Sequence, residues 1–399
     1  MAKKTIKQKY KKKLRRPEPI GNWYGEPNLG SYYDDNEIKA VVKVLKNSRK
    51  WHTGFGPNSE EINNFENAFA KYCGVKHAIA VSNNGNGFDM VLRSLSLSKK
   101  DEIILPALNY KAWYMALMRY DSKLVFCDIN LKTMNIDPRE IEKKINKNTR
   151  LICPVHFGGI SCDEKLIDNI AREASKKFGT KIKVVYDAAR AAGVNYRGSK
   201  VGSGGLCEIF SFHSAKLLTT LGEGGMITTN NSSLSKKLRD MRNYGGENDW
   251  GMNYRMSKVQ ASFGIEQLNR LDDLNKLRVK IANRRTNYLN KLKNILLPVD
   301  QKYSTNIFYL YPIMVSDNWG LKERNKIVKS LEKEYGIICA TPKFINIRWK
   351  YIQKSLGIPE LPKTEELCSK VFCPILHPKL NKKQELYINS AIANVIKSI

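Results

Sequence analysis

V-V-Y-D-A-A-R at residues 184–190 and S-F-H-S-A-K-L-L-T-T-L-G-E-G-G-M at residues 211–226 decide the fold class of this chain. The first segment places an acid, Asp187, at the end of an apolar run typical of a buried strand. The second places Lys216 after another such run and just before a glycine cluster. In an open α/β sheet, ligands bind beyond the carboxyl ends of the strands, so both side chains are expected near one site.

An acid and an amine in these positions match the needs of pyridoxal phosphate. The amine can hold the aldehyde as a Schiff base, and the acid can keep the pyridine nitrogen protonated so that the ring acts as an electron sink. Taken singly, such residues are usually a helix-capping Asp and a solvated surface Lys, so neither Asp187 nor Lys216 alone is strong evidence. Together they predict a pyridoxal phosphate site with Lys216 and Asp187 as its catalytic residues.

The sequence around this pair alternates between strand-like and helix-like units. Such alternation predicts an α/β fold with a large, doubly wound, mostly parallel sheet and helices on both faces. We expect strands at 77–81, 102–106, 123–129, 150–156, 182–187, 208–212 and 225–229, and helices at 87–95, 112–118, 138–145 and 164–174.

The pattern changes on both sides of this region. Helices are expected at 34–46 and at 60–72, where Gly74 ends the second. A charge-rich helical stretch at 256–294 precedes a strand at 307–315 and helices at 325–335 and 384–396. We therefore predict a basic disordered tail (1–20), a large cofactor-binding α/β domain (21–285) and a smaller α+β C-terminal domain (286–399).

Composition limits the class of protein. The chain has 399 residues, 42% of them hydrophobic, which is ample for a packed core. No apolar stretch approaches the ~18 residues that a membrane span needs, and no signal-peptide core follows the basic N-terminus. The eight cysteines form no C-x-x-C pair and the five histidines show no metal-ligand spacing. We expect a cytoplasmic protein without a metal site.

The formal net charge of +30 is the one compositional anomaly. Residues 1–16 hold nine Lys or Arg and no acid. A basic surface attracts nucleic acid or anionic membranes, but the sequence contains no recognised nucleic-acid module. We favour a lysine-rich composition with a basic tail, expect no nucleic-acid partner, and note that a basic surface suits a substrate carrying a diphosphate.

Ordered motifs along the chain add a resemblance. From about residue 25 to the C-terminus the chain resembles the DegT-type (StrS-like) sugar aminotransferases, which are fold-type-I pyridoxal phosphate enzymes of nucleotide-sugar biosynthesis. The matching motifs are T-G-F-G-P (53–57), G-V-K-H-A-I-A-V-S-N (74–83), D-E-I-I-L-P-A (101–107), P-V-H-F-G-G (154–159), D-A-A-R (187–190), S-F-H-S-A-K (211–216) with G-E-G-G (222–225), R-N-Y-G (242–245) and N-Y-R-M-S-K-V-Q-A-S-F-G-I-E-Q-L (253–268).

The resemblance implies an activity and partners. The enzyme would transfer an amino group from an amino acid, by resemblance glutamate, to a keto group of a nucleotide-diphosphate sugar, for amino-sugar and polysaccharide biosynthesis. It would act as a homodimer with shared active sites. Lys216 would bind the cofactor and shuttle the proton, Asp187 would pair with the pyridinium nitrogen, and Tyr110 would stack on the cofactor ring. Glu223 would lie near the site.

The remaining site residues also follow from the resemblance. Ser211 and the turn at Asn84 and Gly85 would bind the cofactor phosphate, the turn through backbone N–H groups at the N-terminus of a helix. Asn253 and Arg255 would reach the phosphate from the partner subunit.

Two of these positions depart from the family pattern. The phosphate turn reads S-N-N-G where S-G-T is usual, and Arg190 stands where the family often has His or Gln. A cation at Arg190, beside the phenolic oxygen of the cofactor, would favour the ionised form of that oxygen.

Two other functions share this fold. One is a sugar dehydratase, but in such relatives histidine replaces the cofactor lysine, and Lys216 argues against it. The other is a non-catalytic regulatory or binding protein, which the basic tail and the altered phosphate turn keep open. The identity of the sugar is expected to depend on the loops at Trp51–Pro57 and Lys343–Trp349.

Overall fold

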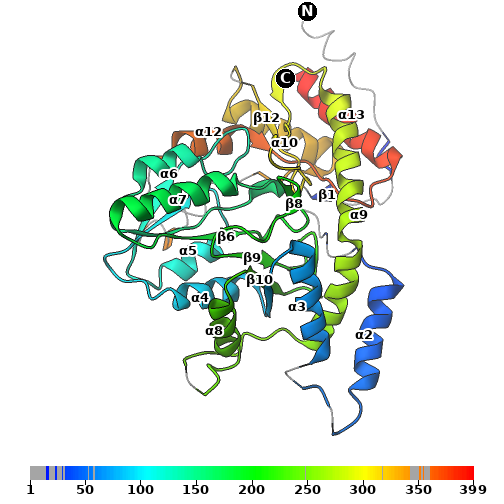
Figure 1. Ribbon diagram of the computed structural model, residues 1–399. Helices are drawn as coiled ribbons and strands as arrows, with labels where there is room; N and C mark the ends of the chain where they lie inside the picture. The colour runs from blue at the N-terminus through cyan, green and yellow to red at the C-terminus, as the bar shows by residue number, and fades with distance from the viewer. Residues whose placement is uncertain are drawn as a thin grey trace, which may run out of the picture.

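The protein is built around a seven-stranded sheet (Figure 1). The structure, a computed structural model, describes residues 15–17, 23–24, 29, 32–52, 54–56, 59–247, 249–316, 318–341, 350–351, 354 and 360–399. The strands lie in the order β2-β10-β9-β6-β5-β3-β4, and β10 alone runs antiparallel to its neighbours. Their bounds are β2 His77–Val81, β3 Glu102–Pro106, β4 Lys123–Cys127, β5 Thr149–Ile152, β6 Lys183–Asp187, β9 Cys207–Ser211 and β10 Gly225–Thr229.

Helices cover both faces of this sheet, because alternate residues of each strand enter different cores. Along β2, Ala78 and Ala80 pack in one core and Ile79 and Val81 in the other. The second core contains α4 (Asn84–Ser94), α5 (Lys111–Leu117) and α8 (Ser232–Arg242). The opposite face carries α3 (Glu60–Cys73), α6 (Pro138–Lys144), α7 (Glu164–Phe178) and the start of α9 (Lys258–Leu289). These layers confirm the predicted α/β fold class.

Helix α9 runs from this sheet to a separate core near the C-terminus (Figure 1). A capping box starts it, with Ser257 and Gln260 bonded to each other's backbone. The far core contains a small sheet, β11 (Ile295–Leu296), β12 (Ile313–Val315) and β14 (Val371–Phe372), and the helices α10 (Leu321–Tyr335) and α13 (Lys382–Ser398). Helix α12 (Pro362–Lys370) packs beside α10 and β12, and its buried Leu367 belongs to the core that contains Ala78 and Ala80. The predicted domain boundary at 285/286 stays a prediction.

Shorter elements complete the described chain. They are β1 (Trp23–Tyr24), which pairs with β13 (Ile337–Ile338), α2 (Asp35–Asn47), which packs on α9, the 3₁₀ turn η2 (Phe157–Gly159), and the hairpin β7 (Asn195–Tyr196) with β8 (Ser199–Lys200). Every helix in the described ranges is too short or too polar to cross a bilayer.

Several predicted elements differ from the structure in their bounds: the strand expected at 150–156 is the shorter β5, and the helices expected at 164–174 and 325–335 are the longer α7 and α10. Two further differences have a cause in the hydrogen bonding. Helix α4 begins at Asn84 instead of residue 87, because the Asn83 side chain accepts the Asn86 N–H and caps the first turn. Only the last three residues of the strand expected at 307–315 form a strand, β12. The backbone of the preceding residues makes hydrogen bonds outside the sheet. Ile307 N donates to Gly159 O at 2.9 Å, and Arg278 donates to the carbonyls of Ile307 and Phe308.

Some predictions fall on residues outside the described ranges. They concern the tail apart from residues 15–17, Thr53 and Pro57 of the T-G-F-G-P loop, and the 343–349 loop.

Candidate active site

A cavity of about 510 Å³ gathers most of the predicted site residues. It opens where β6 and β9 end and where β2 leads into α4. Among its lining residues are Asn84, Gly85, Tyr110, Asp187, Arg190, Ser211, Lys216 and Glu223. Asn253 and Arg255 are not among them.

Asp187 is the last residue of β6 and is 4% exposed. Its Oδ1 accepts the Ala189 N–H at 2.9 Å, and its Oδ2 accepts the indole N–H of Trp113 at 2.8 Å. Burial raises the pKa of Asp187, while the Ala189 N–H, the charges of Lys216 and Arg190 and the Trp113 bond all oppose this rise. The surroundings thus favour the ionised carboxylate against its desolvation.

Lys216 approaches the same cavity from the turn that follows β9. Its backbone N–H donates to His213 O at 2.8 Å, which fixes the turn. Its Nζ lies 3.5 Å from the Tyr309 hydroxyl and 5.1 Å from the centre of that ring. Tyr309 is buried and comes from the segment before β12, so the C-terminal part of the chain positions the lysine.

The N-terminus of α4 forms another wall. The first-turn N–H groups of a helix have no intrahelical acceptor, and here Asn83 takes only that of Asn86. The Asn84 side chain turns away, because its Nδ2 donates to Ile209 O at 3.2 Å. Ser211, at the end of β9, also faces this wall. The wall therefore offers backbone donors and a hydroxyl to an anion.

Gly225, the last glycine of G-E-G-G, lets β10 pass close to this helix terminus. A Cβ at Gly225 would lie 2.8 Å from the Asn83 carbonyl carbon and 2.9 Å from Asn84 N. Contacts this short would displace the start of α4. The glycine in this motif therefore has a packing role.

Arg190 and Tyr110 also line the cavity. The Arg190 guanidinium is 4.8 Å from the Phe157 ring and 5.3 Å from the Tyr309 ring. Tyr110 precedes α5 as its N-cap residue and is 55% exposed, so its ring is available to a ligand.

Asn253 and Arg255 interact with each other outside the lining. Arg255 Nε donates to Asn253 Oδ1 at 3.0 Å, and its Nη1 donates to Asn243 Oδ1 at 2.6 Å. Their predicted action in a partner subunit stays a prediction.

Trp113, Tyr309 and Asn109 were not predicted as site residues. Trp113 sits in the apolar run A-W-Y-M-A-L-M, where its indole N–H, which needs a partner when buried, was the available signal. Asn109 lines the cavity at 4% exposure, and its Nδ2 has no hydrogen-bond partner among the described residues. Tyr309 is far from Lys216 in the sequence, and no sequence motif marked it as a site residue.

Comparisons with known proteins identify the family of this chain. Residues 32–393 match the DegT/DnrJ/EryC1/StrS aminotransferase family. The chain is 34% identical to the GDP-perosamine synthase of Caulobacter vibrioides over 75% of this chain and 79% of that protein. It is 36% identical to the dTDP-3-amino-3,6-dideoxy-alpha-D-galactopyranose transaminase of Aneurinibacillus thermoaerophilus, over 71% and 76% respectively.

Solved structures show the same fold. DesV of S. venezuelae, in complex with a ketimine intermediate, superposes with a TM-score of 0.82 at 27% identity, covering 94% of this chain and 98% of that one. Helicobacter pylori PseC, an aminotransferase involved in the biosynthesis of pseudoaminic acid, gives 0.83 at 25% identity, covering 92% and 98%. The predicted family and enzyme class are thereby confirmed: this chain belongs to the DegT/DnrJ/EryC1/StrS aminotransferase family.

Proposed function

We propose that this protein uses pyridoxal phosphate to transfer an amino group from an amino acid, glutamate, to a keto group of a nucleotide-diphosphate sugar. One observation carries the proposal: Lys216 and Asp187 line a single cavity, and the charge of Lys216 acts on the Asp187 carboxylate. The names of the relatives, which are transaminases or synthases of nucleotide-linked amino sugars, support the substrate class.

The residues of the cavity fit the cofactor. The unpaired Asn109 Nδ2 is a buried donor that a bound ligand would satisfy. Asn84 and Gly85 offer first-turn N–H groups of α4 to the phosphate, and Ser211 offers its hydroxyl. Backbone donors replace the threonine hydroxyl that the S-N-N-G turn lacks.

The chemistry assigns distinct tasks to the protein groups. When bound, the cofactor supplies an electron sink that makes the α-hydrogen of the amino donor acidic. Lys216 accepts that proton at Nζ and returns it during transfer, for which its amine must be neutral. Tyr309 holds the amine in place. Asp187 must stay ionised to hold the pyridine nitrogen protonated, and Trp113 and Ala189 stabilise that state.

We also propose a homodimer in which each chain completes the other's site through Asn253 and Arg255. An exposed apolar stripe on α2 supports an interface, because Ile38, Val42 and Leu45 follow helical spacing and are 40–51% exposed. We place the enzyme in the cytoplasm, where its eight cysteines, all of them free, stay reduced.

The proposal is tested by incubating the cofactor-loaded protein with glutamate and a panel of nucleotide-linked keto sugars, with product detection by mass spectrometry. We expect an amino sugar and an equal amount of 2-oxoglutarate from one member of the panel, and neither from Lys216→Ala. A product that has lost one water molecule from the keto sugar and gained no nitrogen would indicate a dehydratase. A protein that turns over no member of the panel and binds no pyridoxal phosphate would contradict the proposal.

A further inference from the structure

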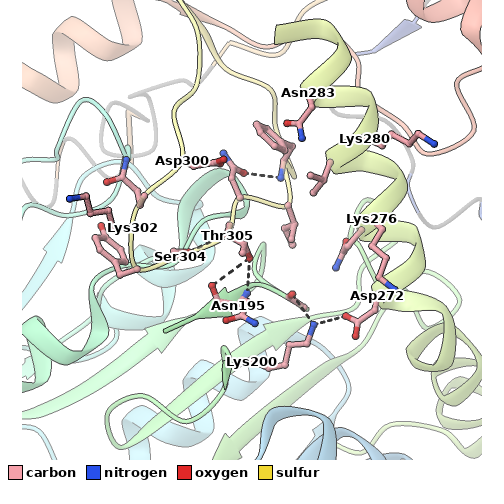
Figure 2. A pocket seen from close by; sticks show the side chains of 18 of the residues that line it. Asn195, Lys200, Asp272, Lys276, Lys280, Asn283, Asp300, Lys302, Ser304 and Thr305 are labelled. Atoms are coloured by element: carbon pink, nitrogen blue, oxygen red, sulfur yellow. Dashed lines mark hydrogen bonds and ion pairs between the residues drawn. The ribbon is translucent and has the colours of Figure 1, made fainter. Parts of the chain in front are cut away.

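A second, larger cavity of about 990 Å³ lies apart from the active site, and the linings of the two cavities share no residue. One face of α9 forms one wall, since Asp272, Lys276, Asn283 and Asn287 recur at helical spacing. Segment 300–308 and the β7–β8 hairpin form the others (Figure 2). Its volume is at the upper end of the range of small-molecule sites, about 300–1,000 Å³.

The polar side chains of this cavity suit a hydroxyl-rich ligand. In Figure 2, Asn283 on α9 and Asn195 on β7 lie on opposite sides of the hollow. Asn283 and Asn287 make no side-chain hydrogen bond to any described residue, so their amides are available as donors and acceptors. Asn275, which also lines the cavity, is 4% exposed, and its Oδ1 has no partner within the described part of the chain.

The charges of the lining suit an anion. It contains two carboxylates, Asp272 and Asp300, and six cations: Arg197, Lys200, Lys276, Lys280, Arg284 and Lys302. Lys200 is bound to Asp272 at 2.6 Å, and three other cations pair with carboxylates outside the lining. Lys280 and Lys302 form no ion pair with a described residue, and in Figure 2 they lie on opposite rims of the cavity with their side chains extending outward. They remain free to bind a phosphate.

Apolar surface supplies the third part of the recognition. Val279 and Phe308 contribute aliphatic and aromatic surface, and the half-buried Tyr303 packs edge-on against Tyr196 with ring centres 6.0 Å apart. Such surface packs against the C–H face of a sugar ring while amides bind its hydroxyls.

We propose that this cavity is a second binding site that takes a phosphorylated sugar, with its hydroxyls on the asparagine amides and its phosphate on Lys280 or Lys302. A free sugar phosphate and a nucleotide-linked sugar share this chemistry. The site is separate from the transamination centre, so it stands or falls independently of the proposed reaction.

Isothermal titration calorimetry of the cofactor-loaded enzyme with glucose 1-phosphate, UDP-glucose, glucose and inorganic phosphate tests the site. We expect at least one of the two phosphorylated sugars to bind, and glucose and phosphate to bind at least tenfold more weakly than it does. Binding of glucose 1-phosphate alone assigns the site to free sugar phosphates. Because the active site is also proposed to take nucleotide-linked sugars, binding of UDP-glucose assigns the cavity to the nucleotide-linked form only where the cavity variants weaken that binding.

Variants locate the binding. Asn283→Ala combined with Lys280→Ala and Lys302→Ala should weaken it at least tenfold, whereas Lys329→Ala, an exposed lysine on α10, should leave it unchanged. All the substituted side chains are exposed, and melting curves will confirm that the variants fold. Failure of both phosphorylated sugars to bind, equal binding by the triple variant, or phosphate binding as tightly as its sugar ester would each overturn the proposal.

Discussion

Trp113 and Asp187 are joined by a 2.8 Å hydrogen bond from the indole Nε1–H to Oδ2, which ties helix α5 to the end of β6. The bond is buried, and its acceptor is the carboxylate proposed to face the pyridine nitrogen. The Trp113 ring also packs against Phe88 with centroids 3.7 Å apart, so its position is fixed from α4 as well. Helix α5 therefore both packs in the core and stabilises the ionised form of Asp187.

Trp113→Phe should move the acid limb of the kcat/KM profile to higher pH. The variant loses a hydrogen bond to a charged group, worth about 1.5–3 kcal/mol, which stabilises the ionised form. The pKa of Asp187 then rises further, because one of the groups that oppose the effect of burial is gone. Because the ionised form is the active one, activity is lost as pH falls through this pKa, and the loss starts at a higher pH.

Tyr114→Phe is the matched control for Trp113→Phe. Its hydroxyl, next in sequence and buried, donates to the Pro106 and Ala107 carbonyls and does not contact Asp187. This variant should lose stability without moving the acid limb. If the acid limbs of the kcat/KM profiles of the two variants coincided, Trp113 would not influence the pKa of Asp187.

Gly87→Ala should weaken cofactor binding by displacing α4 from the sheet. A Cβ at Gly87 would lie 2.9 Å from Ile209 Cγ2 and 3.4 Å from Ile227 Cγ1. Overpacking of this kind costs about 1–3 kcal/mol and shifts the helix whose N-terminus is proposed to hold the phosphate. Equilibrium titration with pyridoxal phosphate should show a raised Kd, and melting curves a lowered Tm.

Gly320→Ala serves as the control for Gly87→Ala. Gly320 is also at a helix start, before α10, but a Cβ there meets nothing within 4 Å. This variant should keep the wild-type Kd. If Gly87→Ala bound pyridoxal phosphate with an unchanged Kd, the N-terminus of α4 would not be part of the phosphate site.

A buried group beside the site makes stability depend on pH. His156 Nε2 lies 3.3 Å from Glu208 Oε2 and 3.7 Å from Glu164 Oε1, and all three side chains are buried. Burial raises the pKa of each glutamate to about 8. In the unfolded chain both carboxyls are ionised above pH 7, so the folded state binds more protons and loses stability as pH rises from 7 to 9.

Glu164→Gln should reduce this loss, because the variant removes one of the two carboxyls with raised pKa. Urea unfolding at pH 7 and pH 9 gives the free energy of unfolding at each pH. We expect the difference between these two free energies to be about 1 kcal/mol smaller in the variant than in the wild type. Glu173→Gln, an exposed position on α7, should behave as wild type. A fall in stability that is equally steep in both variants would contradict the assignment.

Mixing Lys216→Ala with Arg255→Ala tests the shared site. In a two-fold dimer, a mixed pair contains one site with both residues intact and one with neither. An equimolar mixture of two inactive variants should therefore recover about a quarter of wild-type activity after subunit exchange. No recovery, with mixed dimers shown by mass spectrometry, would place Arg255 outside the partner's site.

Sequence patterns predicted the strands within a few residues, because each is a short apolar run closed by turn residues. They also placed Lys216 and Asp187 at strand ends, where their side chains reach one cavity. Trp113 and Tyr309 could not be predicted as partners, since tertiary packing alone brings them to those residues.

The failure at 307–315 has a similar origin. The run has strand-like composition, but Gly159 and Arg278 bind the backbone of its first half. Such long-range hydrogen bonds override local propensity.

The most direct test is reduction of the cofactor-loaded enzyme with borohydride, followed by proteolysis and mass spectrometry of the peptides. Borohydride fixes the cofactor to whichever amine holds it. We expect one pyridoxyl phosphate adduct per chain, on the peptide containing Lys216. An adduct on another lysine, or an unmodified Lys216 in a fully loaded enzyme, would contradict it.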